Sequence, residues 1–320
     1  MADHLKRLAK STRSEHTLPH MNNKSLRGTI CAVLGAITFG LNPFFGIPLY
    51  REGLEPLSVL FYRFALGALM LGVLLLLSGR KLHLQRRYLL PTMGAGALLA
   101  LTCLFWFMTF KIMDSGIGAT LIFIYPIVVT LMMWGLYGER PSGKTLIGTG
   151  LALLGVALTC TPGEESRVCT RGLIYITLSA FTYALYIVAV RKSRLRELSS
   201  DKLTFYSLFF AIPVFLAALR GGYDLQLLPN HRALGFALGL AFFPSLLSFL
   251  FTTIAIRHIG PTRTAILGAL EPLTAVLIGV LCFGEHMSLR LACGTGIILL
   301  AVTLVILAGT PKENSFTDLS

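Results

Sequence analysis

Charged side chains are scarce in this sequence: they make up 13% of its 320 residues, about half the share that is usual in soluble domains. Hydrophobic residues account for 54%. A soluble protein of this length cannot hide that much apolar surface in one or two cores. The composition therefore excludes an ordinary soluble enzyme, a disordered chain and a fibrous repeat, and it indicates a polytopic membrane protein.

Motifs typical of zinc peptidases, serine hydrolases and dinucleotide-binding enzymes are also lacking. There is no H-E-x-x-H and no G-x-S-x-G, and Gly94-Ala95-Gly96 is not followed by the third glycine of a dinucleotide loop. The six cysteines show no C-x-x-C spacing, and pairing of Cys160 with Cys169 across one loop is the less favoured alternative. We therefore expect no enzyme activity, no metal and no cofactor.

Apolar segments of about 20 residues recur along the whole chain, which is the length of a helix that crosses a bilayer. Glycine, proline and charged residues separate them, as at Pro141-Ser142-Gly143. The segments are too long for the tilted strands of a membrane barrel. They predict an all-α polytopic membrane protein with ten transmembrane helices, at residues 28–50, 56–78, 89–110, 116–137, 143–161, 171–190, 203–220, 232–256, 261–283 and 289–308.

The net charge of +13 follows the pattern of a topology signal. The 28 Lys and Arg residues lie in short segments between apolar runs, so a nucleic-acid-binding face is not expected. Twenty of them fall on the side of the N-terminus and seven on the other, with Arg63 inside a span. Because cytoplasmic loops carry the excess of positive charge, we predict a multi-pass protein of the plasma (inner) membrane with both termini cytoplasmic, as tails 1–27 and 309–320.

The chain also repeats itself. A shift of 146 residues places Pro126 on Pro272 and Gly138-Glu139 on Gly284-Glu285. Each half holds five predicted spans, and an odd number means that the second half enters the membrane from the opposite side. The sequence therefore predicts two inverted five-helix repeats, at 28–161 and 171–308, which is an architecture of secondary transporters.

The repeated motifs resemble those of a known family. Gly138-Glu139-Arg140-Pro141, then Gly148 and Gly155-Val156, is similar to the helix 4–5 motif of EamA-type transporters in the drug/metabolite transporter superfamily. Similar motifs stand at 61–64, 270–272 and 284–288, so the resemblance covers about residues 28–308. It implies transport of small organic solutes through a cavity lined by spans 1, 3, 4, 6, 8 and 9. It does not name the solute.

Polar side chains stand at helical spacing in five spans, and such residues inside a membrane face a cavity or a neighbouring helix. For a single Ser or Thr, a hydrogen bond back to its own helix is the more common explanation. Spans 5 and 10 are not among these five spans and carry small residues for close packing, at Gly148, Ala152, Ala292 and Gly296. The substrate-binding candidates are Thr38, Asn42, Trp106, Tyr125, Tyr183, Tyr186, Ser245, Ser248 and Glu271.

Two charged residues and two prolines also lie inside predicted spans. We expect the Arg63 guanidinium to snorkel to the outer interface, with direct anion binding as the alternative. Glu271 either pairs with Arg63 or a hydroxyl, or carries a proton. Pro126 and Pro272 each remove a helix hydrogen bond, which frees the carbonyls of Ile122 and Gly268.

These features predict a secondary transporter, which we expect to be an exporter, of small organic metabolites such as amino acids, working by alternating access. Two other classes stay open: an intramembrane lipid-modifying enzyme, which needs at least two ionisable groups at one depth, and a non-transporting sensor or scaffold. The expected partners are a small-molecule solute and the lipid bilayer, without nucleic acid. The sequence leaves monomer and dimer equally open.

Overall fold

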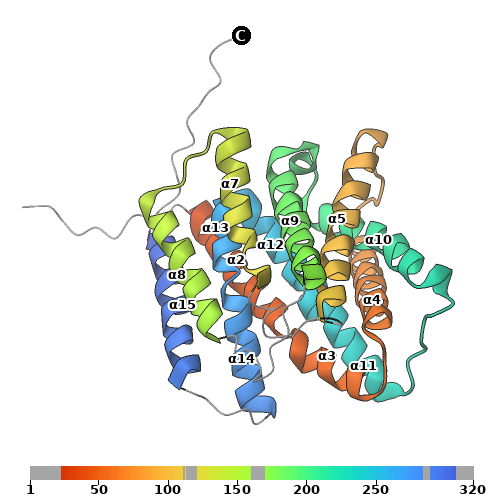
Figure 1. The fold of residues 1–320 in the computed structure, drawn as a ribbon. Coiled ribbons are helices and arrows are strands. Elements are labelled where there is room, and N and C mark those ends of the chain that lie inside the picture. The colour runs from red at the N-terminus through yellow and green to blue at the C-terminus, as the bar shows by residue number, and fades with distance from the viewer. Residues whose placement is uncertain (1–22, 111, 113–120, 160–169, 284–288, 308–320) are drawn as a thin grey trace, which may run out of the picture.

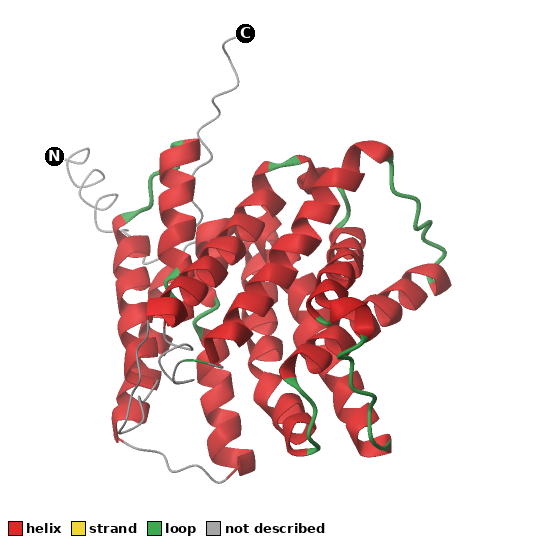
Figure 2. Ribbon diagram, turned by 45° about the vertical axis from the view of Figure 1, so that its right-hand side comes forward, coloured by secondary structure: helices red, strands yellow, loops and turns green. Residues whose placement is uncertain are grey.

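The computed structural model is a bundle of helices (Figures 1 and 2). It describes residues 23–110, 112, 121–159, 170–283 and 289–307, and every regular element within these ranges is helical. The tails 1–22 and 308–320, Cys160, Cys169 and the second motif copy at 284–288 lie outside the described residues. The elements are α2 (Asn23–Gly40), α3 (Asn42–Arg51), α4 (Pro56–Leu77), α5 (Arg86–Phe110), α7 (Tyr125–Tyr137), α8 (Gly143–Thr159), α9 (Thr170–Lys192), η1 (Arg194–Glu197), α10 (Ser200–Ala218), η2 (Arg220–Gly222), α11 (His231–Leu240), η3 (Ala241–Leu247), α12 (Ser248–Ile259), α13 (Pro261–Leu267), α14 (Leu270–Phe283) and α15 (Leu289–Leu307).

The all-α prediction is confirmed, and most predicted spans coincide with long apolar helices. Seven segments of the described chain are long and apolar enough to cross a membrane: Asn23–Arg51, Pro56–Leu77, Arg86–Trp106, Thr170–Lys192, Ser200–Ala218, His231–Ile259 and Pro261–Cys282. Three shorter apolar helices occupy the other predicted spans, at Tyr125–Tyr137, Gly143–Leu158 and Ala292–Ile306.

The helix ends fall into two groups at opposite ends of the bundle. At one end, Glu139 after α7 bonds to Lys192 at the end of α9, and Arg191 donates to the carbonyl of Arg257 near the end of α12. The start of α2 packs there as well, because a Cβ at Gly28 would meet His258. At the other end, the turn after α3 contacts the loop before α11, where Asn230 donates to Glu52. This grouping matches the two sets of loops that the charge count separates.

Helix contacts come in pairs that are related by exchanging the two halves of the chain. The contact of α2 with α12 has its counterpart in that of α9 with α5, and α2 with α14 has its counterpart in α9 with α7. Two further contacts join helices of equivalent position, α7 with α13 and α8 with α15. The halves therefore interlock, and the centre of the bundle lies between them (Figure 1).

Small residues bring α8 and α15 close together. A Cβ at Gly155 would lie 2.7 Å from Cγ1 and 2.9 Å from the backbone nitrogen of Ile298, and one at Gly148 would meet Val305. The prediction for Gly148 on α8 thus holds in the structure. The prediction for α15 is wrong, because Ala292 and Gly296 are exposed and the contact runs along the face of Ile298 and Val305.

The Gly138-Glu139 motif has a structural explanation. Gly138 ends α7 in the left-handed region, with φ 67°, and the amides of Gly138 and Glu139 close the helix on the carbonyls of Trp134 and Met133. The same run, 138–145, fits the spacing G-x-x-x-x-G-K-[ST] of a phosphate-binding loop. That motif requires a strand before the loop, whereas a helix precedes this one.

Two helices are interrupted at matching places in the two halves. Turn residues at 123–124 precede α7, and turn residues at 268–269 separate α13 from α14, in each case a few residues before Pro126 or Pro272. A third irregularity is η3, a π-helical segment between α11 and α12. Interruptions of this kind often mark functional sites in membrane helices.

Candidate functional site

Two adjoining cavities lie about midway along the helices, where the interrupted segments meet. They share four lining residues, Phe39, Tyr125, Tyr183 and Glu271. The remaining lining residues come from both halves of the chain and from α2, α5, α9, α12, α13 and the segment before α7; they are Ala32, Gly35, Ala36, Leu99, Thr102, Cys103, Trp106, Ile122, Phe123, Ser179, Ile187, Phe249, Ser248, Thr252, Thr264, Ala265 and Gly268. The cavity thus has the helices that the sequence predicts around it.

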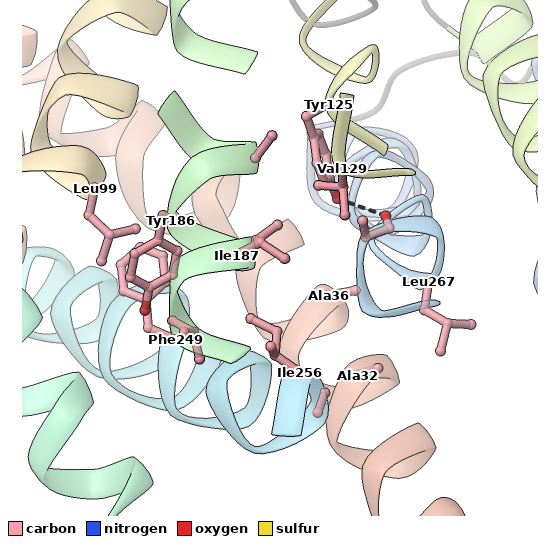
Figure 3. Close-up of a cluster of buried hydrophobic side chains, with 14 of the residues drawn as sticks. Ala32, Ala36, Leu99, Tyr125, Val129, Tyr186, Ile187, Phe249, Ile256 and Leu267 are labelled. Atoms are coloured by element: carbon pink, nitrogen blue, oxygen red, sulfur yellow. Dashed lines mark hydrogen bonds between the residues drawn. The ribbon is translucent and has the colours of Figure 1, made fainter. Parts of the chain in front are cut away.

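Tyr125 connects the two interrupted helices. Its hydroxyl donates to the carbonyl of Ala265, at 2.9 Å, from the start of α7 to α13 (dashed line in Figure 3). That carbonyl is free to accept because the amide of Ala269 turns to Ile266 instead of continuing the helix. Gly268 makes room for the tyrosine, since any side chain there would collide with the Tyr125 hydroxyl.

The carbonyl made available by this break is therefore not the one expected from the proline. Pro272 has no N–H, but the Gly268 carbonyl accepts from the amide of Glu271, at 2.9 Å. The carbonyl that accepts a hydrogen bond from the other half of the chain, from the Tyr125 hydroxyl, is that of Ala265. The sequence rule fails here because the helix stops before the proline and restarts at Leu270, so the bonds of a continuous helix are not formed.

Glu271 lies in the first turn of α14 and faces both cavities. Among the described residues, no basic group lies within ion-pair distance of it, so the structure does not contain the predicted pairing with Arg63. Close packing holds the backbone in place, because a Cβ at Gly40 of α2 would lie 2.7 Å from the Glu271 carbonyl.

The aromatic residues of α9 separate into two environments. Tyr183 lines both cavities and packs edge-to-face against Tyr125, with ring centroids 4.8 Å apart. Tyr186 is fully buried between α5 and α12, beside Leu99 and Phe249 (Figure 3), and does not line the cavity. Ser179 lines the larger cavity and donates to the carbonyl of Thr102 on α5.

The α5 candidate Trp106 and its neighbour Thr102 line the larger cavity. On α12, Ser248 lines the smaller cavity and donates to the Gly35 carbonyl, at 2.9 Å. Ser245 does not line it; its oxygen accepts from Arg63. The two serines face different directions because Ser245 lies in the π-helical segment. A π-helical turn is wider than the α-helical turn on which the predicted spacing depends.

The two candidates of α2, Thr38 and Asn42, also stand apart from the cavity. Thr38 donates back to the carbonyls of Leu34 and Gly35, as hydroxyls within helices commonly do. The helix breaks at Leu41, and the Asn42 amide donates to the Phe39 carbonyl across that break. Phe39 itself faces the cavity in their place.

Arg63 points into the protein, so the expectation that it snorkels to the interface is wrong. Its side chain is only 3% exposed. It donates through Nε to Ser245 Oγ at 2.7 Å and through Nη2 to the Pro244 carbonyl at 3.1 Å, both in η3. The guanidinium lies over the rings of Phe39 and Phe249, with the carbon 5.0 and 5.9 Å from their centroids.

Reasoning from polar residues missed the apolar part of the cavity wall. Phe39, Leu99, Phe123 and Phe249 carry no polar group that distinguishes them from lipid-facing residues. A usable signal exists for some of them: Leu99 precedes Thr102 by three residues, and Phe249 precedes Thr252 by three, so they share a helical face with a cavity-lining hydroxyl.

Known proteins are similar to this chain along most of its length. The model of the EamA-like transporter family matches residues 26–161 and again 170–307. An uncharacterized protein of Pseudomonas aeruginosa, PA1977, is 30% identical over 88% of this chain and 94% of its own. An uncharacterized transporter of Archaeoglobus fulgidus is 30% identical over 60% of this chain and 67% of its own. The uncharacterized inner membrane transporter YedA of Escherichia coli is 26% identical, over 82% and 86% of the two chains.

The fold is also found among solved structures. One crystal structure superimposes with a TM-score of 0.77 and covers 88% of this chain and 97% of that chain. The sequences are 15% identical, so this likeness shows a common fold.

Proposed function

The chain belongs to the EamA-like transporter family and is a multi-pass membrane transporter, and from this we propose that it carries small organic metabolites by alternating access through the central cavity. The observation that carries the proposal is the bond between Tyr125 and Ala265. It joins two helices that are interrupted at matching positions in the two halves, and the cavity opens beside it. Such paired interruptions position the substrate sites of many secondary transporters.

We propose ten spans in two inverted repeats, 28–161 and 171–308, flanked by tails 1–27 and 309–320. The seven long and three shorter apolar helices support the number of spans. The pairing of helix contacts under exchange of the halves supports a pseudo-two-fold relation between them. The charge bias supports an orientation with both termini in the cytoplasm of a plasma (inner) membrane.

Polar contacts join the halves at both ends of the bundle, and these suit a gating role. At the proposed cytoplasmic end, Lys192 pairs with Glu139, Arg80 pairs with Asp201, and the hydroxyl of Tyr88 donates to Glu197. At the other end, Asn230 donates to Glu52. Surface contacts of this kind contribute little stability each, so one set can break while the other holds. Opening the two ends in turn would expose the cavity to one side at a time.

The solutes that we propose have apolar or aromatic parts, amino acids being the class expected from the sequence. The aromatic wall of the cavity supports this, because aromatic rings bury apolar ligand surface efficiently. Export is the direction that we propose. Among the described residues, Glu271 is the one carboxyl group of the cavity wall, which weakens the alternative of a lipid-modifying enzyme with two ionisable groups.

Counterflow in proteoliposomes tests the proposal. The purified full chain is first screened by thermal shift against amino acids and other small metabolites, since a bound ligand stabilises the folded state. Liposomes loaded with a stabilising solute should then accumulate the labelled solute above protein-free liposomes. A solute that stabilises the protein but shows no counterflow would support the sensor or scaffold, and lipids altered on incubation would support the enzyme.

A further inference from the structure

The described side chains that line the cavity combine aromatic rings with a single acidic group. Six aromatic side chains line it: Phe39, Trp106, Phe123, Tyr125, Tyr183 and Phe249. Among the residues that the structure describes, the one lining side chain that is fully charged in water at neutral pH is the carboxylate of Glu271, and none of these lining residues is a lysine or arginine. A negative group beside ring faces attracts organic cations, since rings bind a cation over their negative faces.

Most hydroxyl groups of the cavity wall already donate within the protein. Tyr125 donates to the Ala265 carbonyl, Ser179 to Thr102, and Ser248 to Gly35. Thr102 and Thr264 donate to carbonyls of their own helices. A solute carboxylate would need donors, because a buried charge without partners is costly. Tyr183 and Thr252 carry the remaining lining hydroxyls, so the described wall offers an anion few donors and no positive charge, and Glu271 would repel it.

Arg63 does not supply the missing donor. Its Nε and Nη2 are held by Ser245 and Pro244, and the residue is not part of the cavity lining. Its guanidinium lies over Phe39 and Phe249, both of which line the cavity. This arrangement balances the charge of Glu271 at a distance without placing a positive group where the solute lies.

We propose that the cavity recognises an organic ammonium ion, an amine with an apolar or aromatic body, with the ammonium group at Glu271 and the body against the aromatic wall. This rests on the proposed function in one respect, that the central cavity is the transport site. It changes the solute class from amino acids to amines, because an amino acid adds a carboxylate for which the described wall has no positively charged partner. Amines are therefore expected to bind more tightly than the amino acids from which they differ by that group.

Fluorescence of Trp106 offers a local measurement of binding. The chain has two tryptophans, and Trp134 is 52% exposed on α7, so Trp134→Phe leaves only the one at the cavity. The probes are 2-phenylethylamine, phenylalanine, 2-phenylethanol and phenylacetate, which present an ammonium, a zwitterion, a neutral group and an anion. The amine should bind at least tenfold more tightly than each of the others.

A charge-removing variant separates the role of the carboxylate from that of the wall. Glu271→Gln should weaken binding of 2-phenylethylamine at least tenfold and leave 2-phenylethanol unchanged. Asp224→Asn is the matched control, because Asp224 lies on the surface beside Arg220 and should change neither. The comparison of the four probes on protein that retains Glu271 tests the preference for an ammonium group even if Glu271→Gln fails to fold.

Binding of phenylalanine or phenylacetate as tight as that of the amine would overturn the proposal, as would unchanged amine affinity in Glu271→Gln. Counterflow then tests the transport function separately from the cation site. Counterflow of a neutral or zwitterionic solute, without amine binding, would reject the cation site and leave the transporter. Amine binding without counterflow of any solute would retain the site and reject transport.

Discussion

Tyr183 and Tyr186 are three residues apart on α9, yet their side chains lie in different surroundings. Tyr183 faces the cavity, whereas Tyr186 is fully buried, with its hydroxyl close to those of Ser207 and Thr253. Tyr183→Ala should weaken solute binding about tenfold with little loss of stability, because one aromatic contact is lost. Tyr186→Ala should instead cost about 3–5 kcal/mol of unfolding free energy, as truncation of a buried aromatic does. Thermal unfolding and ligand titration on both variants measure the two effects.

Tyr223→Ala serves as the control for both variants, since Tyr223 is 94% exposed and should change neither binding nor stability. Equal loss of stability in Tyr183→Ala and Tyr186→Ala would mean that both side chains serve helix packing and not solute binding. The sequence predicts both tyrosines as cavity residues, because they stand on one helical face. Which of two neighbours faces the cavity depends on how α5 and α12 pack against α9, and a pattern within α9 does not contain that information.

The close contact between α8 and α15 is a property of two elements, and two glycines of α8 test it. Gly155→Ala should cost about 1–3 kcal/mol of stability, because the new methyl group would press on the backbone of Ile298, which cannot move aside as a side chain does. Gly150→Ala, one and a half turns earlier, has no described atom within 4 Å of the new group. It should leave stability unchanged or raise it by up to about 1 kcal/mol, since alanine favours the helix.

Thermal stability of the two purified variants in one detergent gives the comparison. Similar effects from Gly155→Ala and Gly150→Ala would mean that the helices do not approach as closely as the structure shows. The first motif of the family resemblance contains Gly155, and this contact explains why a side chain is not accommodated there.

Helix positions were predictable and helix interruptions were only partly so. Long apolar runs give the spans because a buried backbone must form helical bonds in a membrane. Pro126 and Pro272 indicate the two breaks, but the freed carbonyl proves to be that of Ala265. The π-helical segment η3 also contains a proline, Pro244, but the prolines inside α3, α5 and α10 leave those segments α-helical, so a proline alone does not predict the π-helix. A distant side chain, Arg63, binds this segment. Contacts between elements set these details.

At the scale of the whole molecule, the two halves enclose two adjoining cavities and meet through polar contacts at both ends. The sequence predicts this arrangement well, because the repeated motifs and the alternation of loop charge are both visible in it. It does not predict which residues close the ends, since Glu139 and Lys192 come together only in the folded bundle. The central claim is that the cavity opens to one side at a time.

Accessibility of Cys103, which lines the cavity, tests that claim most directly. In a chain with the other five cysteines replaced by serine, Glu139→Cys and Lys192→Cys are joined by a short bismaleimide while bound solute protects Cys103. After the solute is removed, an impermeant thiol reagent is applied from one side of the membrane at a time. Alternating access predicts that Cys103 reacts from either side before the crosslink and, after it, only from the side opposite Glu139. Equal reaction from both sides of the crosslinked protein would contradict the account.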